Sequence, residues 1–290
     1  MNDYAVITDS SCDLPADLAE ELELTVLPLS LNLAGKEYYN YLDGHEISFE
    51  DFYQNIREGK ACTTSAVNME AFVQAMEPIL QSGKDVLCIA FSSGLSNTYN
   101  AAKLACEELA PKYPERKVYA VDTLCASLGE GLLVYLAVQE KRRGKSIDEL
   151  RGWLENTKLH LCHWFTVEDL NHLKRGGRIS AATALIGTML SIKPVLHVDD
   201  EGHLINMGKV RGRRASLLAL VDHMEETAVD PASQTVFISH GDCLEDARFV
   251  EQEVRRRFGV QNVRINYVGP VIGAHSGPGT IALFFLGTHR

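Results

Sequence analysis

The sequence contains no CxxC pair, and its seven cysteines are an odd number that a disulfide framework cannot pair completely. We therefore expect free thiols in a reducing compartment, with six of the seven cysteines acting as small core residues. No apolar run approaches the roughly 18 residues of a membrane span, and the N-terminus lacks a secretion signal. These absences predict a soluble, cytoplasmic protein with no integral membrane segment and at most transient membrane contact.

The sequence also lacks the basic excess of a nucleic-acid-binding protein. Its 28 Lys and Arg residues are outnumbered by 39 Asp and Glu residues, which gives a formal net charge of −11. Binding to a phosphate backbone depends on cations that neutralise the phosphates, so we expect no nucleic-acid partner. Two local basic runs remain, KVRGRR at 209–214 and VRRRFG at 254–259.

What the sequence does have is enough apolar material for a large core. Hydrophobic residues make up 46% of its 290 residues, a length at which one core commonly divides into two. We expect two α/β domains, 1–160 and 161–290, with a ligand held between them because ligands favour such interfaces. No Gly-, Ser- or Pro-rich linker marks the boundary.

The two halves differ in their patterns. Apolar strand-like runs alternate with helix-like segments in the first half, which predicts a mainly parallel sheet with helices on both faces. In the second half a tight turn inside 192–211 predicts a β-hairpin, and hence a mixed or antiparallel sheet with helices. The predicted strands are 5–8, 24–33, 85–91, 117–122, 235–240, 263–269 and 281–287, besides the hairpin.

Hydroxyl- and glycine-rich stretches follow several of the predicted strands. They are DSSCD (9–13), CTTSAVN (62–68), SSGLSN (92–97) and GAHSGPG (273–279). Each has an ordinary explanation as a turn or helix cap. In a parallel sheet, however, such turns gather at the carboxyl ends of the strands, where α/β proteins bind ligands. Together they predict a binding site.

A serine hydrolase is the main alternative. AFSSG (90–94) nearly matches the nucleophile elbow G-x-S-x-G and places Ser92 in the nucleophile position. Ser92 or Ser96 would act with His275, and Asp222 or Asp242 would supply the acid. The same serines serve equally well as helix caps, so the residue pattern leaves both interpretations open.

Cofactor and metal motifs are weak. GKS at 144–146 lacks the upstream glycine of a phosphate loop, because that position is Gln139, and no GxGxxG occurs. His160, Cys162 and His163 lie close together, but no second pair of ligands completes a zinc site. We expect no metal and no cofactor.

A series of ordered motifs runs along the whole chain. They are ITDSSCDLP (7–15), VLPLSL (26–31), Thr64-Ser65 with Phe72, SSGLSNTYNAA (92–102), DTLCASLGEG (122–131), LNHLKRGGRIS (170–180), IKP (192–194), KVRGR (209–213) and VIGAHSGPG (271–279). With these motifs the chain resembles the DegV family, bacterial fatty-acid-binding proteins that serve fatty acid kinase. Two features depart from the family pattern, because Ala66-Val67 stands where Gln-Pro is frequent and Asn97 stands where Gly is frequent.

The resemblance implies a carrier with no enzymatic activity of its own. A long-chain fatty acid would lie in a tunnel between the two domains, and a separate ATP-dependent fatty acid kinase would phosphorylate its carboxylate. The protein would then carry the acyl phosphate toward phospholipid synthesis. The family pattern assigns the carboxylate to Thr64 and Ser96, with Ser65, Ser93 and His275 beside them, and Arg211 near the head group and the partner.

Several segments have two interpretations. LIGTML (185–190), VIGA (271–274) and LFFLG (283–287) are candidates for the tunnel wall, or ordinary core. KRGGR (174–178) is either a contact to the kinase or its nucleotide, or a solvated loop whose glycines adopt positive φ.

Overall fold

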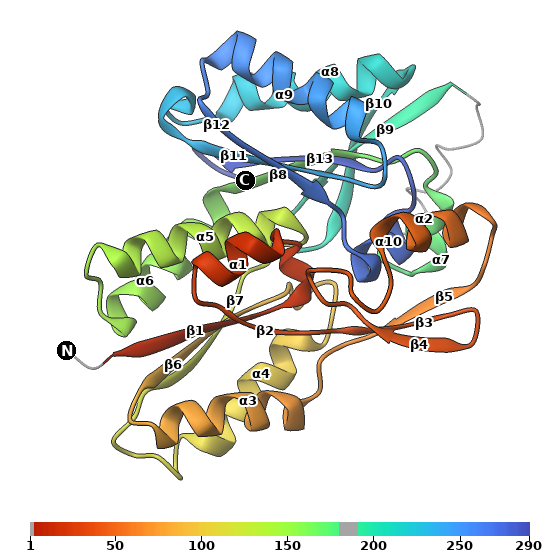
Figure 1. Cartoon of the computed structure of the whole chain (residues 1–290). Helices are drawn as coiled ribbons and strands as arrows, with labels where there is room; N and C mark the ends of the chain where they lie inside the picture. Colours follow the sequence, from red (N-terminus) through yellow and green to blue (C-terminus); the bar gives the residue numbers. More distant parts are fainter. Residues whose placement is uncertain (1–2, 180–190) are drawn as a thin grey trace.

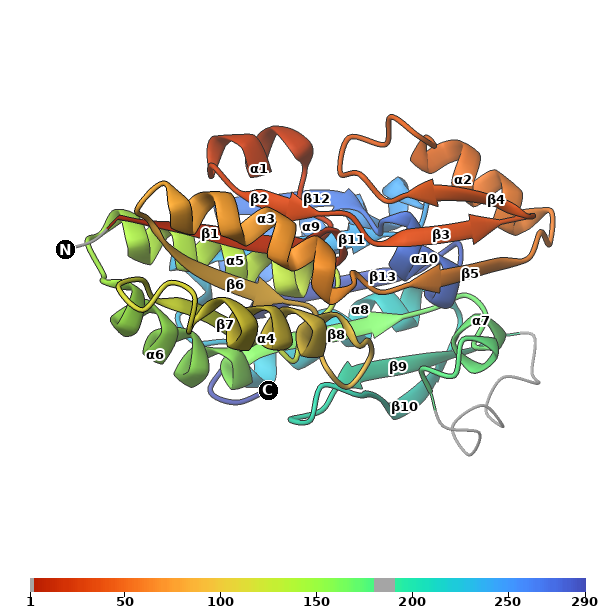
Figure 2. The same ribbon diagram turned by 90° about the horizontal axis from the view of Figure 1, so that it is seen from below.

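The computed structural model of the protein describes residues 3–179 and 191–290. Two β-sheets are stacked with helices between them and on both outer sides, as Figures 1 and 2 show. A third, smaller sheet lies at one end of the stack beside α2 (Phe49–Arg57), α7 (Asn171–Arg175) and α10 (Pro270–Ser276). The fold is thus α/β with two principal sheets, as predicted.

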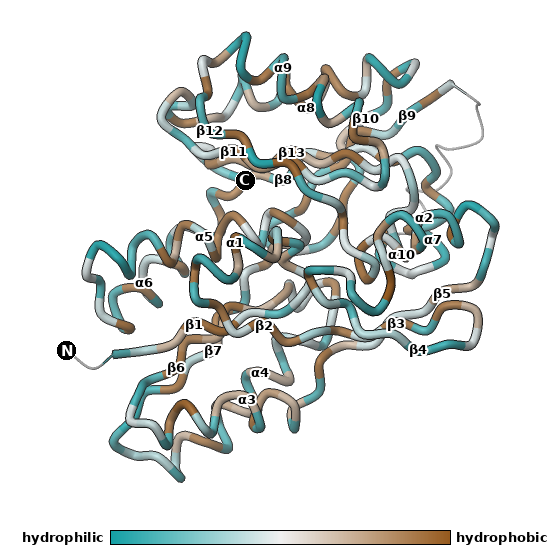
Figure 3. The backbone as a smooth tube through the Cα atoms, in the orientation of Figure 1, coloured by the Kyte–Doolittle hydropathy of each residue, from teal (hydrophilic) through white to brown (hydrophobic). Residues whose placement is uncertain are grey.

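The first sheet is entirely parallel, with strand order β2-β1-β6-β7. All six residues of β6 are buried, because helices cover both faces of the sheet. Figure 3 shows the contrast between hydrophobic β6 and hydrophilic α2. The strands are β1 (Tyr4–Asp9), β2 (Thr25–Leu27), β6 (Asp85–Ala90) and β7 (Val118–Asp122), and the helices are α1 (Ala16–Glu21), α3 (Met69–Gln81), α4 (Thr98–Leu109), α5 (Leu128–Arg142) and α6 (Ile147–Thr157).

The second sheet is mixed, with strand order β10-β9-β8-β13-β11-β12. The predicted hairpin forms from β9 and β10, and only the β11–β12 pair is parallel within the described strands. Helices α8 (Arg213–Thr227) and α9 (Leu244–Phe258) cover its outer face in Figure 1. The strands are β8 (Leu161–Thr166), β9 (Ile192–Val198), β10 (Leu204–Arg211), β11 (Thr235–His240), β12 (Asn262–Tyr267) and β13 (Ile281–Leu286).

The small third sheet corrects two predictions. The predicted single strand 24–33 is divided into β2 and β3 (Ser30–Leu33), since Pro28 between them has no N–H to continue a ladder. The stretch 62–68, predicted as a turn, begins with strand β5 (Cys62–Ser65), which pairs antiparallel with β3. With β4 (Lys36–Tyr39) these strands form the order β4-β3-β5.

The two principal sheets share a buried hydrophobic cluster, in addition to the separate clusters that each sheet forms. A single buried cluster contains Leu87 from the first sheet, Leu132 from α5 and Phe284 from the second sheet. The chain division at residue 160 therefore remains a prediction, although β8, the first strand of the second sheet, begins at Leu161. Across residues 3–179 and 191–290, no helix combines the length and apolar character needed to cross a bilayer.

Candidate functional site

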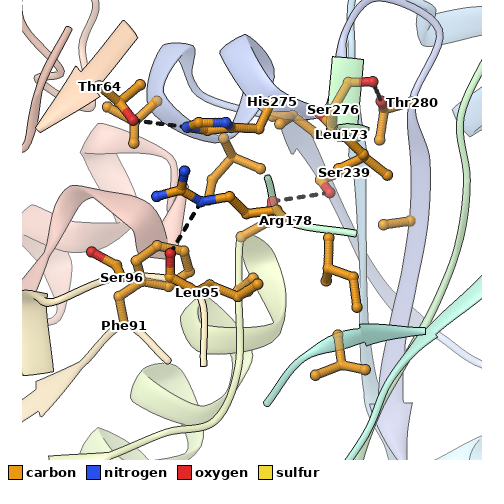
Figure 4. Close-up of a pocket in the computed structure, with 18 of the residues that line it drawn as sticks. Thr64, Phe91, Leu95, Ser96, Leu173, Arg178, Ser239, His275, Ser276 and Thr280 are labelled. Carbon is orange, nitrogen blue, oxygen red and sulfur yellow. Dashed lines mark hydrogen bonds between the residues drawn. The ribbon is translucent and has the colours of Figure 1, made fainter. Parts of the chain in front are cut away.

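An apolar cavity of about 260 Å³ lies between the two principal sheets and the small sheet. Both halves of the chain line it, and Figure 4 shows residues of its wall. Its lining is mainly apolar, with hydroxyl groups, imidazoles and one guanidinium at a few points. The apolar part includes Leu29, Phe91, Leu95, Phe165, Leu173, Val198, Val268, Val271, Ile272 and Phe284.

Thr64 and His275 meet at this cavity. Thr64 Oγ1 lies 2.8 Å from His275 Nε2, which joins β5 to α10. The stretch 273–279 was predicted as a turn, but its first four residues belong to α10 and the turn begins at Gly277. Gly273 permits this helix to pack closely, since a Cβ there would lie 2.7 Å from the hydroxyl oxygen of Tyr53. The helix therefore fixes the direction of the imidazole.

His275 is neutral at physiological pH. Burial, together with the positive charge of Arg178, lowers the pKa of its imidazole to about 4. Gly176 packs directly against the ring, because a Cβ on Gly176 would lie 2.2 Å from His275 Nδ1. Among the described residues, that Nδ1 has no hydrogen-bond partner. A neutral imidazole can donate from one nitrogen and accept at the other, so it suits an anionic oxygen without neutralising it.

Arg178 is a site residue that the sequence interpretation missed. Its Nε donates to the carbonyl of Leu95 at 3.3 Å, and its Nη1 donates to the carbonyl of Gly176 at 2.5 Å. These bonds hold the guanidinium at the cavity wall near His275 (Figure 4). The basic KRGGR stretch was the available signal, but it was interpreted as a partner contact or a solvated loop.

The three predicted serines occupy different positions. Ser96 lines the cavity, and its Oγ accepts from the N–H of Thr98 at 3.2 Å at the start of α4. Ser65 also lines the cavity, although the residue as a whole is exposed at the end of β5. Ser93 is exposed and outside the lining, and its N–H donates to Asp122 Oδ1. The structure thus brings Thr64, Ser65, Ser96 and His275 to one cavity and leaves Ser93 outside it.

Arg211 is not part of the cavity lining formed by the described residues. It is the last residue of β10, is exposed, and lies opposite Ile192 in the hairpin. Of the predicted tunnel segments, Val271, Ile272 and Phe284 line the cavity. The segment 185–190 lies outside the described residues.

The geometry does not assemble the serine hydrolase. Ser92 is buried away from the cavity, and its Oγ donates to the carbonyl of Gly202 at 3.0 Å. Asp222 pairs with Arg257, while Asp242 forms a salt bridge with Arg57. Neither acid therefore orients His275.

The side chains of His160, Cys162 and His163, the weak zinc candidates, contact backbone carbonyl groups. His163 Nδ1 lies 3.0 Å from the carbonyl of Leu161, and His160 Nδ1 lies 3.2 Å from the carbonyl of Gly287. Cys162 Sγ lies 3.2 Å from the carbonyl oxygen of His289. These side chains have structural partners.

A second, outer pocket of about 590 Å³ adjoins the apolar cavity. Thr64, Arg178 and His275 belong to the lining of both. Lys60, Arg175 and Arg178 line the outer pocket, which is therefore basic although the chain as a whole is acidic. The Thr64–His275 pair thus stands between an apolar interior and a basic recess.

The fold and site define an α/β protein with an apolar cavity whose rim carries hydroxyl, imidazole and guanidinium groups. The sequence profile of the DegV family, described as uncharacterised proteins, matches residues 3–288. A DegV domain-containing protein of Clostridium perfringens is 47% identical over 287 residues, which are 99% of this chain and 98% of that protein. The chain belongs to the DegV family.

Solved structures of similar proteins share the whole fold. One is a DegV family protein from Thermus thermophilus described by its fatty acid binding, with a TM-score of 0.88 and 32% identity over 99% of this chain and 100% of that one. Another is DegV of Bacillus subtilis, described as a fatty acid binding protein, with a TM-score of 0.85 and 26% identity over 99% and 100% of the two chains. Fatty acid binding is thus a property of members of this family.

Proposed function

We propose that the apolar cavity binds a long-chain fatty acid, with its carboxylate at Thr64, Ser96 and His275 and near Arg178. The observation that carries the proposal is the Thr64–His275 pair on the rim of an apolar cavity that both halves of the chain line. A carboxylate removed from water needs hydrogen-bond donors, and these groups supply them. The fatty acid binding described for similar proteins of known structure supports this choice of ligand.

The tail supplies most of the affinity. At about 0.8 kcal/mol per buried CH₂, roughly fifteen methylenes contribute on the order of 12 kcal/mol before the costs of binding. A hydroxyl hydrogen bond contributes only about 1 kcal/mol net. The head-group residues therefore set the orientation of the ligand more than its residence in the cavity.

The proposal extends to a partner, an ATP-dependent fatty acid kinase that reaches the carboxylate through the basic outer pocket. One carboxylate oxygen attacks the γ-phosphorus of ATP on the kinase, the bond to ADP breaks, and an acyl phosphate remains on the carrier. Lys60 and Arg175 line this pocket and suit the charge that develops on the transferred group. The hydroxyl groups of Thr64 and Ser96 carry no charge and leave the attacking oxygen nucleophilic, while the Arg178 guanidinium donates to two backbone carbonyls.

Mass spectrometry of an organic extract of the protein purified from bacteria tests the proposed ligand. We expect a long-chain fatty acid, and a lipid-free extract together with no binding of added oleate or palmitate would contradict the proposal. A fluorophosphonate probe separates the hydrolase alternative, since a carrier should not be labelled. The partner is tested separately by acyl-phosphate formation from ATP with a fatty acid kinase.

A further inference from the structure

A second polar group lies in the wall of the apolar cavity, on the side of His275 that faces away from Thr64 and Ser96 (Figure 4). It consists of Ser127 at the start of α5, Ser239 on β11 and Ser276 at the end of α10, which all line the cavity. In Figure 4, Ser239 and Ser276 lie on the opposite side of the view from Thr64 and Ser96. An apolar chain passing these serines would leave their hydroxyl groups without a partner.

Ser276 has a buried hydroxyl group without a hydrogen-bond partner among the described residues. The residue is only 5% exposed, and its side-chain oxygen is buried. Its neighbour Thr280 instead donates to the backbone carbonyls of Ser276 and Gly277. A buried hydroxyl without a partner is costly, and native proteins seldom retain one unless a ligand or water satisfies it.

Ser127 has a strained backbone conformation. Its backbone adopts φ 54° and ψ −146°, a conformation that residues other than glycine rarely take. The strained position directs its Oγ to within 2.6 Å of Asp13 Oδ2 and 3.1 Å of Ser239 Oγ. Strain of this kind persists where the surrounding structure requires the side chain in one place.

The hydrogen-bond chain from Asp13 through Ser127 ends at Ser239. The geometry makes Ser127 Oγ the donor toward both Asp13 Oδ2 and Ser239 Oγ. Ser239 Oγ therefore accepts from Ser127, and its own hydroxyl hydrogen has no acceptor among the described residues. Ser239 is thus able to donate a further hydrogen bond at the cavity wall.

We propose that Ser127, Ser239 and Ser276 form a second polar subsite, which receives a hydroxyl group carried on the chain of the bound fatty acid. The inference rests on the proposed function. It adds monohydroxy fatty acids to the ligands that we expect the cavity to bind. A hydroxyl group both donates and accepts, so it can satisfy Ser276 and Ser239 together. A saturated unmodified chain can satisfy neither.

The test compares stearic acid with a set of its monohydroxy derivatives, substituted at successive carbons, on the delipidated protein by titration calorimetry. A hydroxyl placed elsewhere in the cavity loses its hydration without compensation, so most derivatives should bind about tenfold or more weakly than stearic acid. We expect one position on the chain to escape this loss and bind at least as tightly as stearic acid.

Ser276→Ala identifies the subsite. The variant should weaken the favoured derivative by about tenfold while stearic acid binds no more weakly than before, because only an unpartnered hydroxyl is removed. Ser93→Ala, on an exposed serine outside the cavity, serves as the matched control and should change neither affinity.

If every hydroxy derivative bound more weakly than stearic acid by the same factor, in both the wild type and Ser276→Ala, the subsite would be wrong. An ordered water would then be the hydrogen-bond partner of these serines. Failure of stearic acid and all its derivatives to bind would instead count against the proposed fatty acid ligand. The two failures are therefore distinguishable in one experiment.

Discussion

Thr64 Oγ1 and His275 Nε2 lie 2.8 Å apart although 211 positions separate the two residues in the chain. The contact joins a short edge strand of the small sheet to a helix that precedes the last strand of the second sheet. It brings a hydroxyl group and a neutral imidazole to the same side of an apolar cavity. The proposed position of the carboxylate depends on this contact.

Thr64→Val and Ser96→Ala should each weaken binding of a fatty acid by about 1–3 kcal/mol, because each leaves the carboxylate one donor short. The tail contacts are unchanged, so the variants should still bind ligand. Calorimetric titration with palmitate measures the loss, and thermal unfolding checks that the fold is intact. Ser93→Ala is the control outside the cavity. A Thr64→Val/Ser96→Ala double variant with wild-type affinity would show that the carboxylate lies elsewhere.

Gly176→Ala should displace the imidazole of His275. Gly176 has φ −72°, which alanine accepts without backbone strain, so the effect is purely steric. The added methyl would lie 2.2 Å from His275 Nδ1, and such overpacking costs about 1–3 kcal/mol. We expect weaker fatty acid binding and a shifted His275 resonance in the NMR spectrum.

Gly152→Ala provides the matched control for that change. Gly152 lies within α6, and a Cβ there has no atom within 4 Å among the described residues. Alanine in a helix interior is favoured over glycine by about 1 kcal/mol, so this variant should be neutral or slightly stabilised. If Gly176→Ala behaved like Gly152→Ala in both assays, the close packing of Gly176 on His275 would be wrong.

The principal sheets were predictable from local sequence patterns. Apolar runs such as β6 separate cleanly from helical segments, and the hairpin 192–211 carries its own turn signal. The family resemblance, carried by motifs spread along the chain, was confirmed by the profile match over 3–288. Each strand, turn and motif among these features is formed by residues close together in the chain, which is why the sequence reveals them.

The parts of the site that escaped prediction depend on tertiary contacts. β5 has four residues, half of them exposed, so its hydroxyls were interpreted as a turn. α10 is seven residues long and contains a glycine, and packing against Tyr53 and Phe52 rather than intrinsic propensity holds it. Arg178 is held at the cavity by a hydrogen bond to the carbonyl of Leu95, which is far away in the chain, and no local sequence pattern predicts that contact.

Asp13 gives the protein a pH-dependent stability. Its carboxyl group is fully buried, and burial, with the nearby Asp9 adding to the effect, raises its pKa to about 8. Between about pH 4 and pH 8 the folded state therefore binds more protons here than the unfolded state. Its contribution to stability falls as pH rises through this range. Asp13→Asn should flatten this part of the stability profile by more than about 1 kcal/mol.

Urea unfolding between about pH 5 and pH 8 measures this difference. Asp200→Asn, which alters an exposed carboxylate in the β9–β10 turn, is the control and should retain the wild-type slope. The burial of His275 acts in the opposite direction, since a pKa lowered to about 4 removes stability as pH falls from about 6.5. A wild-type slope in Asp13→Asn would mean that Asp13 is ionised in the folded protein.

Arg211→Ala should retain its fatty acid and fail as a substrate for the kinase. Arg211 is exposed at the end of β10 and outside the described cavity lining, so its loss removes no contact to the buried tail. A guanidinium at the surface can instead bind the partner or the phosphoryl group in transfer. Fatty acid content and acyl-phosphate formation are measured on the same preparation, with the nearby exposed Arg214→Ala as the control. Loss of ligand would indicate a direct clamp on the carboxylate, and unchanged phosphorylation would reduce Arg211 to an ordinary surface residue.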